Sequence, residues 1–97
     1  MPTYISLIRW TEQGARNAKD ALSRREQTLA AVEKAGGRIV GAWWMMGAYD
    51  AVIVTEFPDD ETVSAVVIGA GMAGNTRSET MRAFTAEEMQ RILQKLP

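Results

Sequence analysis

The chain has 97 residues, of which 46% are hydrophobic and 24% charged, and its formal net charge is −1. This length suits one small domain, residues 1–97, with a single core. A net charge so close to zero, with scattered basic residues, gives no electrostatic footprint for nucleic acid or an anionic membrane. Arg9 introduces a charge too early for a signal peptide, and no segment approaches the roughly 20 apolar residues of a membrane span. We therefore expect a cytoplasmic protein.

The sequence contains neither cysteine nor histidine. It therefore cannot build a thiolate nucleophile, a Ser-His-Asp triad, a zinc site of Cys and His ligands or a His-ligated haem. Acid–base chemistry would fall to Asp, Glu, Tyr or Lys with shifted pKa values. We expect no metal and no cofactor, and any metal would have to be a hard cation bound by carboxylates.

The N-terminal segment TYISLIRW (3–10) is rich in β-branched and aromatic residues and is predicted to be a strand. Its alternation separates two apolar sets, one on each face: Ile5 and Leu7 against Tyr4, Ile8 and Trp10. A polar connection follows over residues 11–22, with room for a helical turn. Ser23 and Glu26 have the spacing of a capping box, which predicts a helix from Ser23 to the Gly36–Gly37 pair.

Two further strands are predicted over residues 38–46 and 50–57. Only Gly47-Ala48-Tyr49 separates them, which indicates a hairpin. Pro58 ends the third strand, and Asp59 can cap a second helix.

The stretch VVIGAGMAGN (66–75) contains a literal G-x-G-x-x-G at Gly69, Gly71 and Gly74. A dinucleotide-binding unit would need this stretch to run from a strand into a helix and then into another strand. Here the valines and alanines from Asp59 onward recur at helical spacing, so the glycines fall in the helix. We expect no nucleotide fold: Gly69 and Gly71 would permit close helix packing, and Gly74 would end the helix.

Residues 75–84 alternate well enough to form a fourth strand, and Thr85 and Glu88 form a second capping box at the start of a C-terminal helix. One side of that helix is apolar, with Met89, Ile92, Leu93 and Leu96. The order is therefore β-α-β-β-α-β with an extra C-terminal helix. This order predicts an α+β, ferredoxin-like fold, with a four-stranded antiparallel sheet and two helices on one face.

Both faces of the predicted strands carry apolar and aromatic residues, yet two helices cover only one face. An exposed patch of several hundred Å² is more than a monomer usually leaves in water. A second copy packed sheet to sheet, as a dimeric α/β barrel, would cover it. A groove for another partner is the alternative. The pattern leaves open which set faces outward, and thus whether Ile8 or Ile53 belongs to the interface.

The segments TYISLIRWTEQG, Gly47-Ala48-Tyr49-Asp50 and GNTRSETMRAFT, in this order, resemble the GYD domain proteins, which are named for a Gly-x-Tyr-Asp motif. The resemblance covers essentially the whole chain and implies a dimeric ferredoxin-like α/β barrel of poorly defined biochemical role. The hairpin MGAYDAVIV is also similar, more distantly, to the effector-binding domains of Lrp/AsnC regulators. That similarity implies the ligand-sensing half of such a regulator without its DNA-binding domain.

Tyr49 and Asp50 are the first candidate ligand-binding residues. At a strand end they could contact a ligand or act as acid and base; in the structural alternative, Asp50 accepts backbone N–H groups and Tyr49 packs on the sheet. Asn75, Arg77 and Trp10 complete the candidate set. Arg77 could bind a carboxylate or phosphate, or could pair with a neighbouring acid.

Three functions compete at this stage, and no catalytic residue is identified for any of them. The first is a non-catalytic, homo-oligomeric protein that binds a small molecule as a sensor or accessory protein. The second is a cofactor-independent enzyme, monooxygenase-like or isomerase-like, for which fold analogy is the only support. The third is a purely structural assembly component.

Overall fold

The computed structural model describes all residues 1–97 and confirms the α+β, ferredoxin-like order with an added C-terminal helix. In chain order its elements are β1 (Thr3–Trp10), α1 (Glu12–Arg16), a 3-10 turn (Ala18–Asp20), α2 (Ala21–Lys34), β2 (Arg38–Trp44), β3 (Ala51–Glu56), α3 (Asp60–Met72), β4 (Thr76–Ala83) and α4 (Ala86–Leu93).

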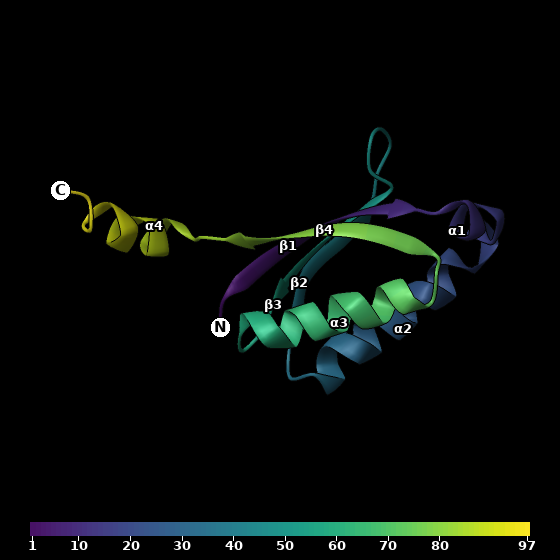
Figure 1. Cartoon of the computed structure of the whole chain (residues 1–97), viewed down its shortest axis with the longest axis horizontal. Coiled ribbons are helices and arrows are strands. Elements are labelled where there is room, and N and C mark those ends of the chain that lie inside the picture. The colour runs from purple at the N-terminus through teal and green to yellow at the C-terminus, as the bar shows by residue number, and fades with distance from the viewer.

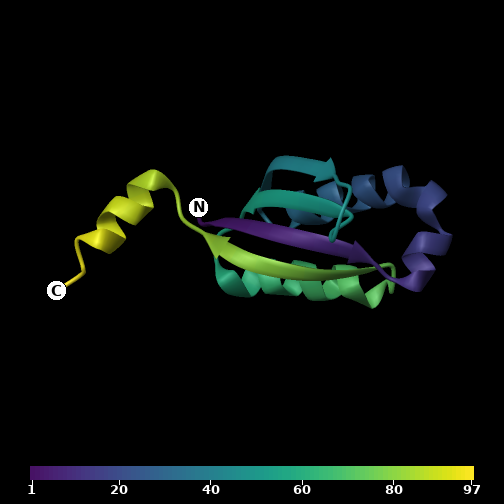
Figure 2. The same cartoon turned by 90° about the horizontal axis from the view of Figure 1, so that it is seen from above.

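The four strands form one antiparallel sheet in the order β2-β3-β1-β4. Helices α2 and α3 lie side by side on one face of this sheet, and no element covers the other, which we call the open face (Figures 1 and 2). The β2–β3 hairpin lies at one end of the sheet, and α4 leaves from the opposite end.

The register of the strands decides which side chains face the helices. Tyr4 of β1 is buried against them and is opposite Thr55 of β3, so every second residue from these two points the same way. Ile8 and Ile53 therefore belong to the helix side. The open face instead presents an apolar set from all four strands: Ile5, Leu7, Trp43, Val52, Val54 and Met81.

The core is small and lies at the α4 end of the sheet. Tyr4, Val32, Phe57 and Val63 form one buried cluster, in which the rings of Tyr4 and Phe57 meet edge to face with centroids 6.3 Å apart. Only 6 of the 97 residues are buried, so most of the apolar side chains remain at least partly exposed.

The predicted start of the first long helix was wrong. The connection over residues 11–22 is itself helical, because the Thr11 hydroxyl accepts the Gly14 N–H (3.1 Å) and caps α1. After one 3-10 turn α2 begins at Ala21, so Ser23 lies inside the helix and does not cap it. A Cβ on Gly14 would lie 2.0 Å from the Asn75 carbonyl oxygen, so only glycine permits this approach of α1 to the start of β4.

In the second half of the chain the cap by Asp59 and the capping box of Thr85 and Glu88 are confirmed. Gly74 follows α3 with a φ of 83°, a conformation that favours glycine. The packing role predicted for Gly69 and Gly71 was wrong, because no atom lies within 4 Å of a Cβ built at either position.

The second strand is shorter than predicted. It ends at Trp44, so Met45 and Met46 lie in the hairpin loop and do not alternate across the sheet. Met46 is 98% exposed, the most exposed of the large apolar side chains.

Candidate functional site

A cavity of about 80 Å³ lies between the first half of α2 and the sheet, at the hairpin end. Its walls are mostly apolar and include Ile8, Trp10, Leu29, Ile39, Trp44 and Ile53. The volume exceeds the 10–15 Å³ or so that one water needs, and the cavity is partly open, so it has room for a small organic group.

Small residues from the helix and the sheet contribute to the walls of the cavity. Ala21 of α2, Ala42 of β2 and Ala51 of β3 all line the space. Further along α2 the residues between helix and sheet are larger: Val32 belongs to the buried cluster that contains Tyr4 and Phe57. The same helix and sheet thus enclose a filled core at one end and a cavity at the other.

Two arginines of α2 stand at the cavity, and they differ in what holds them. The Arg24 guanidinium donates to the carbonyls of Asn17 (2.7 Å) and Gly14 (3.4 Å), and it lies 5.9 Å from the centre of the Trp10 ring. Arg25 has only a 3.5 Å contact with the exposed carboxylate of Glu26. Arg25 is therefore held less firmly than Arg24.

Trp10 is the one predicted site residue that lines the cavity. Its backbone N–H donates to the Asp50 carboxylate (2.8 Å), while the Asp50 N–H donates to the Ile8 carbonyl (2.8 Å). Asp50 thus ties the β2–β3 hairpin to the end of β1, which is a structural role. Its donor comes from another strand, 40 residues away.

The remaining predicted site residues do not gather with Trp10. Tyr49 lies over the open face, where its hydroxyl donates to Glu79 (3.2 Å) and the Arg9 guanidinium stands 4.4 Å from its ring centre. Arg77 is exposed on β4, directly beside Arg9. The Asn75 side chain accepts from Gln13 (3.0 Å) at the α1 junction. The five residues are therefore dispersed over three places.

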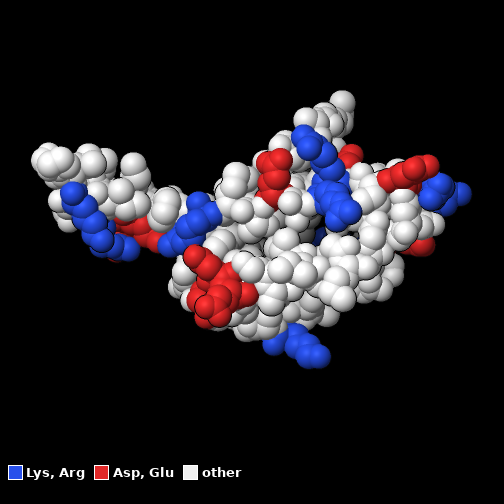
Figure 3. Space-filling model, viewed as in Figure 1, with Lys and Arg blue, Asp and Glu red and all other residues white.

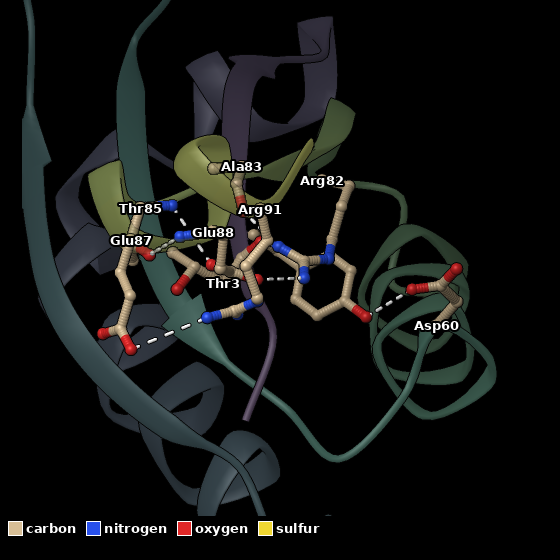
Figure 4. A network of polar contacts seen from close by, with 9 residues as sticks. Thr3, Asp60, Arg82, Ala83, Thr85, Glu87, Glu88 and Arg91 are labelled. Atoms are coloured by element: carbon tan, nitrogen blue, oxygen red, sulfur yellow. Dashed lines mark hydrogen bonds and ion pairs between the residues drawn. The ribbon is translucent and has the colours of Figure 1, made fainter. Parts of the chain in front are cut away.

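Sequence reasoning missed a polar network at the α4 end of the sheet (Figure 4). The buried Tyr4 hydroxyl donates to Asp60, and burial, assisted by that bond, raises the pKa of Tyr4 to about 12. At neutral pH this phenol keeps its proton, which makes it a structural donor and a poor acid or base. No local sequence pattern indicates the Tyr4–Asp60 contact, because it joins residues 56 positions apart; the residue types Tyr and Asp were the only signal.

Arg82 is the centre of the same network. Its guanidinium bonds the Thr3 and Ala83 carbonyls and the Glu88 carboxylate (2.7 Å), and it lies 4.7 Å from the centre of the Phe84 ring. The hydrogen bond from Arg82 lowers the pKa of Glu88 to about 2. Arg82 thus fixes the first turn of α4 to the edge strand.

No three acidic side chains gather in a way that could hold a metal ion. No helix combines the length and the apolar character needed to cross a bilayer. Acidic residues collect at the start of α3, and elsewhere charges of both signs are dispersed over the visible face (Figure 3).

Comparison with known proteins gives three results. The family model described as GYD domain matches residues 4–93. A Thermus thermophilus protein named "Glutamine synthetase and cystathionine beta-lyase binding protein" is 28% identical over 90 residues, which cover 92% of this chain and 95% of that protein. The crystal structure of TTHA0845 from Thermus thermophilus superposes with a TM-score of 0.55 at 25% identity, covering 89% of this chain and 96% of that one. The chain therefore belongs to the GYD domain family.

Proposed function

We propose that the chain is a non-catalytic accessory protein that works as a homo-oligomer and binds a small molecule in the cavity beneath α2. The single observation that carries this proposal is the cavity itself, which is apolar, partly enclosed and flanked by an arginine without a strong partner. Such pockets, with apolar walls and few polar groups, are typical of ligand sites.

The chemistry of the walls indicates the ligand class. The rings of Trp10 and Trp44 offer flat apolar surfaces, and the Arg25 guanidinium at the rim can pair with a carboxylate in two parallel hydrogen bonds. A small carboxylic acid with an aromatic or branched apolar group, such as benzoate, phenylalanine or leucine, combines both features. The apolar group would enter the cavity, and the carboxylate would stay at the rim.

Thermal-shift and calorimetric titrations with these acids test the proposal. We expect binding by at least one of them, weakened about tenfold or more in Arg25→Gln, since one charge-assisted pair is worth about 1.5–3 kcal/mol. The matched control is Arg16→Gln, an exposed arginine of α1 away from the cavity, which should bind as the unaltered chain does. No binding by any member of the panel would contradict the proposal.

Self-association is the second part of the proposed function, and the open face supports it. Ile5, Leu7 and Val54 lie at its centre, and Trp43 beside them is 59% exposed. A second copy packed on this face would complete a dimeric α/β barrel. We expect light scattering to give at least twice the 10.7 kDa mass of one chain at micromolar concentration, and Leu7→Glu to lower that mass. One-chain mass for the unaltered protein would contradict self-association.

The name of the Thermus thermophilus relative suggests a protein partner as well. We propose that this chain likewise binds a metabolic enzyme, through surface that its own oligomer leaves uncovered. Size-exclusion chromatography with purified glutamine synthetase or cystathionine beta-lyase is the test. Co-elution with at least one of them is expected, and separate elution of all components at micromolar concentration would contradict this part.

A further inference from the structure

The last 14 residues, Phe84–Pro97, form an arm that extends away from the body of the molecule (Figure 1). Its helix, α4, packs against neither the sheet nor another helix. Three apolar side chains recur at helical spacing along one side of it, Met89, Ile92 and Leu93, and Leu96 follows just after the helix ends; we call these four residues the α4 stripe. Met89, Leu93 and Leu96 are 45%, 52% and 65% exposed.

The arm begins at a defined place and in a defined direction. The Thr85 hydroxyl accepts the Glu88 N–H and the Glu88 side chain accepts the Thr85 N–H (both 3.1 Å), which closes the capping box. Arg82 then links Glu88 to the Thr3 carbonyl of the body (Figure 4). Because this helix is fixed at its start and its apolar side is uncovered, we infer that it contacts another molecule.

The surface of the single chain indicates how much is left uncovered. A compact monomer of this mass exposes about 5,500 Å², whereas this chain exposes 6744 Å². Its radius of gyration is 14.6 Å, compared with about 12.5 Å for a compact domain of this length. The excess of about 1,200 Å² exceeds the 800 Å² or so that each partner buries in a standard protein interface.

We propose that the α4 stripe packs on a second copy of this chain, against the β2–β3 hairpin at the far end of that copy's sheet. The inference rests on the self-association proposed above and adds the contact that the arm makes. In a twofold pair both arms act at once: each chain donates a stripe and receives one.

The hairpin is the surface that geometry and chemistry favour. It lies at the end of the sheet opposite α4 (Figure 2). If two open faces pack about a twofold axis perpendicular to the strands, each arm meets the other copy's hairpin. There Met45 and Met46 are 36% and 98% exposed, and methionine adapts readily to an apolar partner. An axis parallel to the strands would instead bring the two arms together.

Light scattering on two double variants of the full chain tests the arm. Ile92→Glu with Leu93→Glu places charge in the stripe, and we expect the dimer dissociation constant to rise about tenfold or more, as loss of 1.4 kcal/mol or more of interface energy requires. Gln90→Glu with Gln94→Glu, off the stripe, is the matched control and should stay within about twofold. Near-UV circular dichroism should show an intact core in both, because α4 does not pack on it.

Equal dissociation constants for the unaltered chain and the stripe variant would overturn the inference and leave self-association standing. A one-chain mass for the unaltered protein would overturn both.

Cross-linking tests the location of the contact. Because the chain has no cysteine of its own, the reagent can react only with the cysteines that are introduced. With a short bis-maleimide reagent, Leu93→Cys combined with Met46→Cys should give a covalent dimer, whereas each single variant should stay monomeric on a denaturing gel. A covalent dimer from Leu93→Cys alone would place the arms against each other and overturn the hairpin contact, as would no covalent dimer from the double variant.

Discussion

The two ends of the layer between α2 and the sheet use the same strands and the same helix for different purposes. At the α4 end, Tyr4, Val32, Phe57 and Val63 fill the space and are each at most 4% exposed. At the hairpin end, alanines of the helix and the sheet line a cavity of about 80 Å³. One end holds the fold together, and the other contains the space in which we propose that a ligand binds.

This difference shows how a domain with so few buried residues can combine a filled core with a cavity. The closed end concentrates stability in a few large side chains, supported by the Tyr4–Asp60 and Arg82–Glu88 contacts. The hairpin end, which we call the open end, is less well packed. There the hydrogen bonds of Asp50 to Trp10 and Ile8 hold the hairpin to β1. The filled core and the cavity are therefore separated along the helix.

The largest effect is expected at the closed end. Phe57→Ala removes a ring that is 1% exposed and should lower the free energy of unfolding by about 3–5 kcal/mol, because the cavity it leaves cannot collapse fully. Urea unfolding measures this change. Leu22→Ala, at a leucine of α2 that is 68% exposed, is the control and should stay within about 0.5 kcal/mol. Similar small values for both would mean that the closed end does not carry the stability.

A matched pair of enlargements sharpens the contrast. Val63→Leu adds volume to the filled core and should cost about 1–3 kcal/mol, since overpacking forces strained side chains. Ala42→Val adds volume to the cavity and should be neutral or stabilise by up to about 1 kcal/mol. Both are read from urea unfolding midpoints. Equal losses at the two sites would show that the cavity end is packed as tightly as the core.

Asp50 tests what maintains the open end. Asp50→Ala removes the acceptor of the Trp10 N–H and should lower the free energy of unfolding by about 1–2 kcal/mol, as lost buried hydrogen bonds do. Tyr49→Phe removes an exposed hydrogen bond to Glu79 and should change the free energy of unfolding little. Thermal unfolding measures both changes. An unaltered melting temperature for Asp50→Ala, with ligand binding lost, would instead assign Asp50 to the site.

The smallest effect concerns the point where the arm leaves the closed end. Because the pKa of Glu88 is lowered to about 2 from an ordinary 4.5, its pairing with Arg82 is fully present above about pH 4.5 and is lost as pH falls toward 2. NMR titration of the Glu88 carboxyl should report the low pKa, and Arg82→Gln should return it toward the ordinary value. Titration near 4.5 in the unaltered chain would rule out the Arg82 link.

Much of the fold could be predicted because its signals are local. The Asp59 cap, the box of Thr85 and Glu88 and the alternation in β1 each lie within a few neighbouring residues. The predicted start of α2 was wrong. Ser23 and Glu26 have the spacing of a capping box, but the chain is already helical before them, from the cap at Thr11 onward. A capping pattern indicates a position at which a helix can begin, but the helix begins earlier when the preceding residues are themselves helical.

The candidate site could be predicted only in part because its parts come from distant segments. Trp10 was among the candidates and lines the cavity, but Ala21, Ala42 and Ala51 also line it, and small residues carry no signal on their own. Asp50 and Tyr49 stood out by residue type, although their partners lie 40 and 30 positions away. The arm was predicted as a helix, and no local pattern indicates that this helix packs against neither the sheet nor another helix.

The most direct test of a closed end and a binding end is an amide NMR titration of the full chain with benzoate. The account predicts that resonances of Thr28, Ala42 and Ala51 shift with increasing ligand, while those of Val32 and Val63 stay in place. Shifts centred on Val32 and Val63, or no shift at millimolar ligand, would contradict it.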